Sequence, residues 1–272
     1  MRAGRPFYKM SGSGNDFVFF DTRDGPSTDL ESPSAVESLC ARGTGIGADG
    51  VVFFDPSDPE GPAIRYYNSD GSVGELCGNA TLCAVRLNQI IGGVTTGDLL
   101  IRTDAGGIAA RIVDGLPEID LEPVKEVEVD YRAIPPVGSE KRIGYALAGV
   151  PHIVIEVPSV ESIDVLGRGS EVRRHRSLAM GANVNFVAPE KDGRWLIRTY
   201  ERGVEGETLA CGTGAVAASI LLAGWGRSDS PVRLLTRSGL ELSVRLRRDG
   251  DHWRPSLRGN AELVFTGQLP VD

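Results

Sequence analysis

Two segments of the chain repeat each other, and each places a cysteine directly before an apolar run. The first reads Cys77-Gly78-Asn79 before its run, and the second reads Cys211-Gly212-Thr213-Gly214 before the longer run 215–222. A strand ending in threonine follows each run, 103 − 77 = 26 residues after the first cysteine and 236 − 211 = 25 residues after the second. This spacing predicts one structural unit built twice, with an equivalent thiol at the start of a helix in each copy.

A thiol at the start of a helix has distinctive chemistry. The first turn carries about half a positive charge and several N–H groups without helical partners. It therefore favours a thiolate, and we expect a thiol pKa below the ordinary value of about 8.5. The same N–H groups bind carboxylates, and Gly78 and Gly212 let a ligand approach the backbone. We predict that Cys77 and Cys211 face one substrate, so that one thiol removes a proton from a carbon and the other returns a proton to the opposite face.

Other uses of the cysteines are disfavoured. We interpret Cys40 and Cys83 as buried apolar side chains. A zinc site would need close cysteine or histidine pairs, whereas Cys77 and Cys83 are six residues apart on one helix and, at about 100° per residue, point to different faces. A chain of this length without a secretory signal does not need structural disulfides. Oxidation could still join Cys77 to Cys211 in a reversible inactive state.

Composition narrows the class of protein. The chain has 272 residues, of which 41% are hydrophobic and 24% are charged, which is typical of a soluble globular protein with one large or two modest domains. A net charge of −8 argues against a general nucleic-acid binder. We find no signal peptide and no run of about 20 apolar residues, and therefore expect a cytoplasmic protein without a membrane partner. We find no cofactor motif and expect neither a cofactor nor a metal.

Hydrophobic patterning predicts many short strands and one strongly apolar helix in each half. The run 215–222 is apolar on nearly all sides, so its helix should be buried. The expected helices are 35–41, 78–91 and 212–224. The expected strands are 7–9, 17–21, 51–54, 63–68, 99–103, 108–113 and 118–121 in the first half, then 145–148, 152–157, 183–187, 195–200, 232–236 and 240–245. A hairpin turn is expected at 191–193, and a last strand at 263–265 should pair with the first domain.

These elements predict an α+β fold with two pseudo-symmetric lobes, each a mixed β-sheet wrapped around a central α-helix. We expect the N-terminal lobe to comprise residues 1–117 with 263–272, and the C-terminal lobe to comprise residues 118–262.

In its motifs the chain resembles the diaminopimelate epimerases, from Lys9 to about Gln268. The motifs occur in one order along the chain, at residues 9–17, 45–50, 68–79, 151–152, 183–186 and 200–214. The resemblance implies epimerisation of LL-2,6-diaminopimelate to the meso isomer, a precursor of lysine and peptidoglycan, without pyridoxal phosphate or metal. It also implies a homodimer and a small-molecule substrate.

The resemblance also implies roles for individual residues. Cys211 would be the proton acceptor on the LL isomer and Cys77 the proton donor, with the roles exchanged in reverse. His152 and Glu201 would adjust the pKa values of the thiols, since a carboxylate raises a thiol pKa and an imidazolium lowers it. The substrate-binding set would be Asn15, Asn68, Gly78, Asn79, Asn183, Glu201, Arg202, Gly212 and Thr213. Gly50 stands where some members of the family carry Gln, and Val150 stands where the family often carries Asn.

Three alternatives remain open. Proline and hydroxyproline racemases share the two thiols, but they usually carry His at the position of Asn79, and Asn68, Asn183 and Arg202 favour a substrate with two charged ends. Phenazine-type isomerases lack the thiols. A non-catalytic anion-binding module could use the two helix starts as carboxylate receptors without needing cysteine.

Overall fold

The computed structural model describes residues 4–25, 27–58, 61–74, 77–92 and 99–270. The chain divides into two compact units, Met1–Ile119 with Gly259–Asp272, and Asp120–Arg258. Each unit combines a mixed sheet with few helices, which confirms the α+β class.

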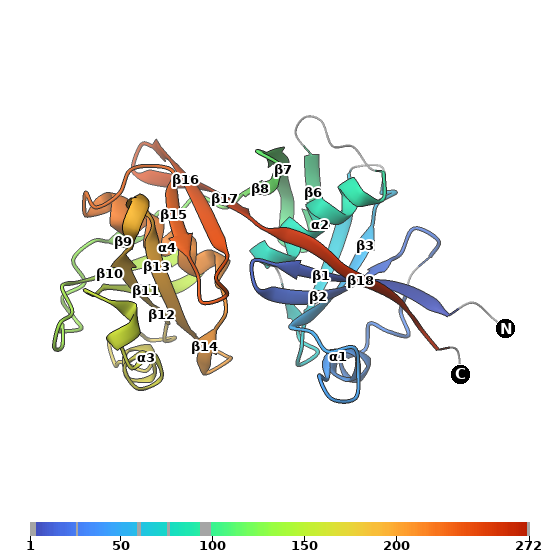
Figure 1. Cartoon of the computed structure of the whole chain (residues 1–272), viewed down its shortest axis with the longest axis horizontal. Coiled ribbons are helices and arrows are strands. Elements are labelled where there is room, and N and C mark those ends of the chain that lie inside the picture. Colours follow the sequence, from blue (N-terminus) through green and yellow to red (C-terminus); the bar gives the residue numbers. More distant parts are fainter. Residues whose placement is uncertain (1–3, 26, 59–60, 75–76, 93–98, 271–272) are drawn as a thin grey trace. The chain divides into compact units, whose positions relative to one another are not determined.

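The N-terminal unit is a mixed sheet in which the last strand of the chain lies beside the first. β18 pairs antiparallel with β1, β1 antiparallel with β2, β2 parallel with β3, and β3 antiparallel with β4. β4 also pairs with β5 and β6, and β6 continues into β7 and β8. The pairing of β18 with β1 confirms the predicted return of the last strand (Figure 1). The elements are β1 (Arg5–Gly12), β2 (Asn15–Asp21), α1 (Pro33–Cys40), β3 (Gly50–Asp55), β4 (Ala63–Asn68), β5 (Val73–Gly74), α2 (Gly78–Ile90), β6 (Leu99–Thr103), β7 (Gly106–Val113), β8 (Leu116–Asp120) and β18 (Ala261–Leu269).

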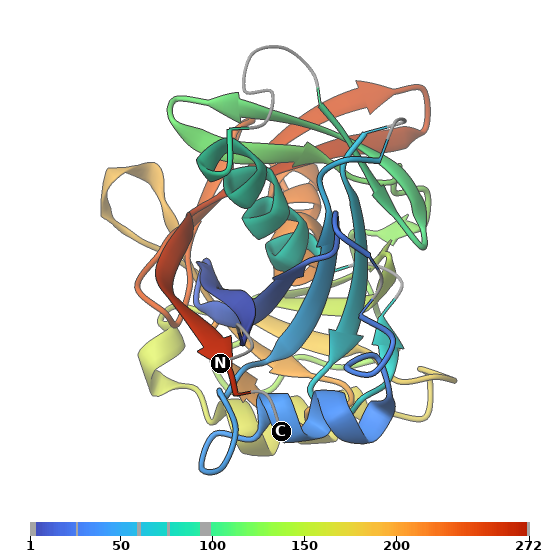
Figure 2. The ribbon, with the colours of Figure 1, turned by 90° about the vertical axis from the view of Figure 1, so that its right-hand side faces the viewer.

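Helix α2 is the centre of this unit. It packs against β1, β4, β6 and β18, and Figure 2 shows strands around it. Its side chains Leu82, Cys83 and Leu87 are fully buried. Gly12 of β1 allows the close approach, because a Cβ there would lie 2.7 Å from the Asn79 carbonyl oxygen. The strands thus hold the first turn of α2, which follows Cys77, in a fixed place.

The C-terminal unit repeats the same pairing scheme. β10 pairs antiparallel with β11, β11 parallel with β12, β12 antiparallel with β13, and β13 parallel with β15. The strands β1, β2, β3, β4 and β6 of the N-terminal unit pair in the same order of antiparallel and parallel neighbours. In the chain order of the C-terminal unit, α4 occupies the position that α2 has in the N-terminal unit. The topology therefore confirms a duplicated unit. The elements are β9 (Val127–Glu128), β10 (Arg142–Ala148), β11 (Val150–Glu156), α3 (Val165–Arg173), β12 (Asn183–Pro189), β13 (Trp195–Glu201), β14 (Gly206–Thr208), α4 (Gly212–Gly224), β15 (Val232–Leu235), β16 (Glu241–Asp249) and β17 (His252–Gly259), with single 3₁₀ turns at Val160–Ser162 and Lys191–Gly193.

Helix α4 is buried on all sides, as its sequence predicts. Every residue from Ala215 to Leu222 is at most 1% exposed. The helix packs on β10, β11, β12 and β16. Gly144 of β10 permits this packing, because a Cβ there would lie 2.6 Å from a Leu221 methyl carbon. Only the two ends of the helix are accessible: its first turn at Cys211, Gly212 and Thr213, and its last residues Ala223 and Gly224.

Among the described helices, none is long and apolar enough to cross a membrane.

Candidate active site

Both predicted thiols stand at the N-cap of their helices. Cys77 caps α2 with φ −126° and ψ 111°, and Cys211 caps α4 with φ −137° and ψ 111°. This extended conformation before the helix is the usual one for a cap, and both side chains are half-buried. The carbonyl groups of Cys77 and Cys211 accept the first helical bonds, from Thr81 and Ala215, each at 2.9 Å. The two copies thus present their thiols in the same local geometry.

The thiol of Cys211 is held by its own helix and by a carboxylate. The backbone N–H of Gly214 donates to Cys211 Sγ at 3.4 Å, and Thr213 Oγ1 lies 3.5 Å from the sulfur. Glu201, at the end of β13, makes a side-chain hydrogen bond with the thiol. Thr208 fixes that carboxylate by donating to Glu201 Oε1 at 2.6 Å. The Cys211 thiol therefore contacts the N–H groups of the first helical turn and also the negatively charged carboxylate of Glu201.

The expected lowering of the Cys211 pKa is wrong. Burial raises the pKa of the Cys211 thiol well above its ordinary value, and the charge of Glu201 raises it further. Thr213 and the Gly214 N–H lower the pKa, but they do not offset burial. Cys211 is consequently a thiol at neutral pH, hydrogen-bonded to a carboxylate.

We expect Glu201→Gln to make Cys211 more reactive toward alkylating reagents while slowing turnover. The substitution removes the charge that raises the pKa of Cys211, so the thiolate fraction at pH 8 increases, and iodoacetamide should modify Cys211 faster. Peptide mapping after timed alkylation measures the rate. Glu205→Gln is the matched control, because Glu205 pairs with Arg173 at 2.9 Å instead. An unchanged or slower rate at Cys211 in the Glu201 variant would contradict the role of this carboxylate.

His152 lies on β11 and is completely buried. Burial lowers the pKa of His152 to about 3, and the positive charge of Arg202 acts in the same direction. His152 is therefore neutral at physiological pH. The expectation that an imidazolium at this position lowers a thiol pKa is wrong, because a buried ring beside a guanidinium does not hold a proton.

A polar network under α4 fixes which nitrogen of His152 carries the proton. Asn185 Nδ2 donates to the Ile153 carbonyl at 3.0 Å, and Thr199 Oγ1 donates to Asn185 Oδ1 at 2.9 Å. These two bonds orient the amide, so its nitrogen also donates to His152 Nδ1 at 3.1 Å. The ring proton then resides on Nε2, which is buried and has no hydrogen-bond partner among the described residues. His152 thus offers a neutral Nε2–H donor.

Asn183 and Arg202 are brought together at the start of β12 and just after β13. The Arg202 backbone N–H donates to Asn183 Oδ1 at 2.8 Å. The guanidinium donates from Nη1 to the Met180 carbonyl at 3.1 Å. Since a guanidinium has five N–H donors, this contact orients Arg202 and leaves donors for a carboxylate.

In the N-terminal unit, Asn79 and Asn15 form the polar surroundings of the α2 start. Asn79 Nδ2 donates to Asn15 Oδ1 at 2.7 Å, and Asn15 Nδ2 donates to Asp49 Oδ2 at 2.9 Å. Asp49 in turn accepts from Arg42 Nη2 at 2.6 Å. Asn79 is 3% exposed, and its Oδ1 has no hydrogen-bond partner among the described residues. The predicted binding residues Asn15 and Asn79 are therefore adjacent, and hydrogen bonds fix the orientation of their side chains.

Asn68 ends β4 and closes a turn. Its backbone N–H donates to the Ser72 carbonyl at 2.9 Å, and its Nδ2 donates to Ser72 Oγ at 3.0 Å. Its role in binding substrate stays a prediction. Val150 is the first residue of β11 and pairs with Ala148.

Two residues that contact the predicted set, Asn185 and Tyr66, are not evident from the sequence. Asn185 orients His152, and it lies two residues after Asn183, so strand alternation places both on one face. Tyr66 makes a hydrogen bond with Cys77, and it lies two residues before Asn68 on β4. The alternation of polar side chains along β4 and β12 was the available signal.

The other two cysteines are buried, as expected. Cys40 is 5% exposed, and burial raises the pKa of its thiol to about 11, while Cys83 is 0% exposed. Over the part of the chain that the structure describes, no group of three Cys, His, Asp or Glu side chains is placed to hold a metal ion.

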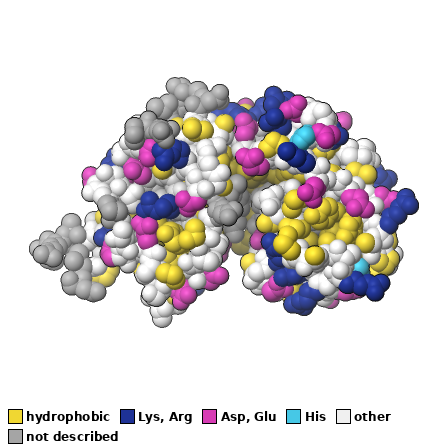
Figure 3. Space-filling view, turned by 180° about the vertical axis from the view of Figure 1, so that it is seen from behind, with side chains coloured by type: hydrophobic (Ala, Val, Ile, Leu, Met, Phe, Trp, Pro, Cys, Tyr) yellow, Lys and Arg dark blue, Asp and Glu magenta, His cyan; other side chains and the backbone are white. Residues whose placement is uncertain are grey.

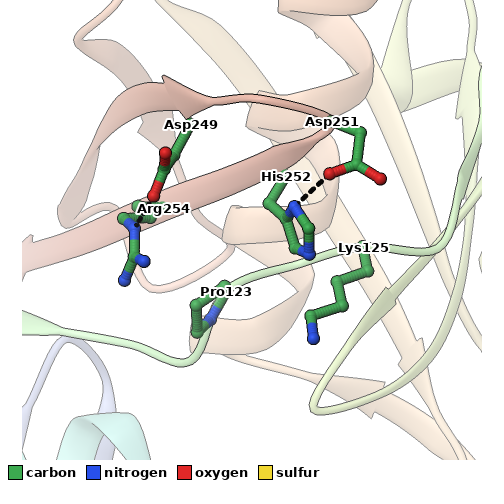
Figure 4. Close-up of a pocket in the computed structure, with 6 residues that line it drawn as sticks. All are labelled: Pro123, Lys125, Asp249, Asp251, His252 and Arg254. Atoms are coloured by element: carbon green, nitrogen blue, oxygen red, sulfur yellow. Dashed lines mark hydrogen bonds and ion pairs between the residues drawn. The ribbon is translucent and has the colours of Figure 1, made fainter.

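A pocket elsewhere in the C-terminal unit contains no thiol. Its charges are mostly paired within it, since Arg254 Nε donates to Asp249 Oδ2 at 2.6 Å and Asp251 pairs with His252 (Figure 4). The pocket is lined by Pro123, Lys125, Asp249, Asp251, His252 and Arg254.

The fold occurs in several solved structures with low sequence identity. A phenazine biosynthesis protein of the PhzF family from Bacillus anthracis superposes with a TM-score of 0.78 at 13% identity, covering 98% of this chain and 99% of that one. A hydroxyproline epimerase from Agrobacterium vitis superposes with a TM-score of 0.67 at 16% identity, covering 98% of this chain and 93% of that one. These likenesses define a fold class that this chain shares with both proteins.

The sequence places the chain within this class. The family model for diaminopimelate epimerase matches residues 7–124 and 144–264. A diaminopimelate epimerase from Gemmatimonas aurantiaca is 45% identical over 97% of this chain and 98% of its own length. The enzyme of the same name from Aquifex aeolicus is 37% identical over 97% of this chain and 97% of its own. The chain belongs to the diaminopimelate epimerase family.

Proposed function

We propose that this protein epimerises LL-2,6-diaminopimelate to meso-diaminopimelate, the precursor of lysine and peptidoglycan, with no cofactor. The observation that carries the proposal is the pair of N-cap cysteines at equivalent positions of a duplicated fold. A module that only bound anions would need the helix starts but not the thiols.

The reaction transfers one proton from the substrate to Cys211 and one proton from Cys77 to the substrate. Glu201 accepts the proton of the Cys211 thiol, to which it is hydrogen-bonded. The Cys211 thiolate then removes the α-proton of the LL centre, and the Cys77 thiol delivers its own proton to the opposite face of that carbon. The product has inverted configuration, Cys211 is again a thiol, Cys77 is left as a thiolate and Glu201 is left protonated. Proton exchange with solvent then returns Glu201 to the carboxylate and Cys77 to the thiol. In the reverse reaction Cys77 is the base and Cys211 the acid.

The remaining site residues bind and stabilise the reacting substrate. The backbone N–H groups of Gly78, Asn79, Gly212 and Thr213 hold the α-carboxylate at the reacting centre. Negative charge that develops on the α-carbon spreads into this carboxylate, so donors aimed at it stabilise the transition state.

The second amino-acid end of the substrate is bound by the polar side chains Asn15, Asn68, Asn183 and Arg202. Arg202 suits a distal carboxylate, because a guanidinium makes two parallel hydrogen bonds with it. The Nε2–H of His152, which has no hydrogen-bond partner among the described residues, is a further neutral donor for the site.

The test is substrate specificity. Reduced protein is incubated in parallel with LL-diaminopimelate, L-proline and trans-4-hydroxy-L-proline, and isomers are separated by chiral chromatography. We expect meso product from diaminopimelate alone, with no loss after dialysis against a chelator and no gain from pyridoxal phosphate. Turnover of the proline substrates alone would move the protein to the sister racemases, and loss of activity on chelation would refute the cofactor-independent mechanism.

We further propose a cytoplasmic homodimer. Hydrophobic side chains gather on one face of the C-terminal unit (Figure 3), and Met180 and Val204 of that unit are 71% and 63% exposed. Exposed apolar surface of this kind is commonly covered by a second subunit. Sedimentation equilibrium measures the mass, and a monomer at micromolar concentration would contradict the proposal.

A further inference from the structure

The two thiols stand at equivalent helix starts but are held differently. Cys211 Sγ accepts the backbone N–H of Gly214, three residues into its own helix. The side chain of Cys77 makes no such bond with the first turn of α2. Its hydrogen bond with the Tyr66 hydroxyl comes from β4 instead. In the N-terminal unit the hydrogen-bond donor to the thiol therefore comes from a neighbouring strand. In the C-terminal unit the donor is a backbone N–H of the helix itself.

Two glycines, which have no side chain, leave the space that the Tyr66 ring occupies. Gly74 of β5 lies directly opposite Tyr66 in the sheet, and a Cβ there would overlap Tyr66 Cδ1. Gly50 of β3 lies on the other neighbouring strand, and a Cβ there would lie 2.5 Å from Tyr66 Cε2 and 3.1 Å from its hydroxyl oxygen. The ring is thus seated over two backbone segments that no side chain covers.

A third contact fixes the orientation of the ring. Phe17 of β2 meets Tyr66 edge to face, with ring centroids 6.0 Å apart and planes at 78°. Phe17 itself is 1% exposed. A ring confined by Phe17, Gly50 and Gly74 has few alternative rotamers, so the position of its hydroxyl is fixed before substrate binds.

The hydroxyl of Tyr66 remains protonated throughout the reaction. Burial raises the pKa of Tyr66 well above its ordinary value, and negative charge at Cys77 and at Asp49 raises it further. A phenol that keeps its proton is a permanent donor. A donor held at a sulfur stabilises the thiolate more than the thiol, since hydrogen bonds to charged acceptors are the stronger ones.

We propose that Tyr66 is a positioning residue for Cys77, stabilising its thiolate by a hydrogen bond from a hydroxyl seated over Gly50 and Gly74. The inference rests on the proposed function only for the use of that thiolate, which forms when Cys77 has donated its proton and which acts as the base in the reverse reaction. The two thiols are then tuned by opposite means: a hydroxyl donor favours the thiolate of Cys77, whereas the Glu201 carboxylate favours the thiol of Cys211.

The test is the pH dependence of alkylation in Tyr66→Phe, which needs no substrate. The full-length protein is treated with iodoacetamide from pH 6 to pH 10, and peptide mapping gives separate rates for Cys77 and Cys211. We expect the midpoint for Cys77 to rise by about one pH unit, since a hydrogen bond to a charged group contributes about tenfold to an equilibrium. The rate at Cys211, whose pKa is raised well above its ordinary value, should not change at any of these pH values, and it serves as the internal reference.

Two further variants make the outcome specific. Tyr67→Phe is the matched control, because the Tyr67 hydroxyl lies 3.4 Å from Glu31 Oε2 and its loss should leave the Cys77 midpoint unchanged. Gly74→Ala keeps the Tyr66 hydroxyl but displaces the ring, so it should raise the midpoint as Tyr66→Phe does. An unchanged Cys77 midpoint in a folded Tyr66→Phe protein would overturn the inference, as would an equal change in the alkylation rates of both thiols.

Measuring the turnover of diaminopimelate tests the proposed function separately from the role of Tyr66. If diaminopimelate is the substrate, the acidic limb of the pH–rate profile in the meso-to-LL direction should move upward in Tyr66→Phe, because Cys77 is the base in that direction. A shifted alkylation midpoint in a protein that does not turn over diaminopimelate would refute the proposed function and leave the tyrosine–thiol contact intact.

Discussion

Replacing either helix-start cysteine with serine should lower the rate of epimerisation by about 1,000-fold or more, because positioned proton transfer contributes on the order of 10² to 10⁴ at each step. A serine hydroxyl is almost the same size as a thiol but is a far weaker acid. In Cys211→Ser the α-proton loses its acceptor, and in Cys77→Ser the carbanion-like intermediate loses its donor. The rate of meso-diaminopimelate formation at saturating LL substrate measures the effect.

The matched controls are the other two cysteines. Cys40→Ala and Cys83→Ala remove thiols that are buried in the N-terminal unit. They should cost some stability but leave turnover per folded molecule near that of the parent protein. Circular dichroism and thermal unfolding separate folding from chemistry. Turnover near the wild-type level in either Cys77→Ser or Cys211→Ser would refute the two-thiol mechanism.

Gly214→Ala should abolish most activity and destabilise the C-terminal unit. A Cβ at this position would overlap Asn185 Oδ1 and lie 3.2 Å from the Cys211 Cβ. Gly214 is buried, so α4 must move away from the network that holds His152, and the thiol moves with it. Overpacking of this kind costs about 1–3 kcal/mol in the free energy of unfolding, and a displacement of the base by about 1 Å costs about 100-fold in rate.

The same substitution at the other end of the helix provides the control. Gly224 is the last residue of α4, and a Cβ there would lie 2.9 Å from a methyl carbon of Val129. Val129 is 45% exposed and can move, so Gly224→Ala should be neutral or slightly stabilising. Urea unfolding and initial rates distinguish the two variants. Wild-type activity in Gly214→Ala would show that the packing between α4 and Asn185 does not position the thiol.

The sequence predicted the helices that carry the thiols because their signals are local. A cysteine followed by glycine and an unbroken apolar run marks the start of a buried helix in both copies, and α2 and α4 begin at Gly78 and Gly212 as expected. The repeated strand order followed from the same duplication. Helix α3 was not predicted, because Val165–Arg173 contains two glycines and only three buried residues. Strand β17 was also missed, because it contains Pro255 and depends on pairing with distant segments.

The electrostatics of the site could not be read from the sequence. A cysteine at a helix start predicts a low thiol pKa, but the burial of Cys211 and the carboxylate of Glu201 depend on the packed fold, and together they raise it. The neutral state of His152 likewise follows from burial beside Arg202. Tyr66 reaches Cys77 only because Gly50 and Gly74 are brought to either side of it by strand pairing.

The most direct test of the two-thiol account is the distribution of deuterium in the first turnovers of LL-diaminopimelate in D₂O. Each thiol carries a single exchangeable hydron, so the base keeps the substrate proton and the acid supplies deuterium from solvent. Mass spectrometry of the separated isomers should find the meso product with one deuterium at the inverted carbon, while the remaining LL substrate stays unlabelled. Protium in the early meso product, or deuterium in the LL pool before meso product accumulates, would show that one base serves both faces and would contradict the account.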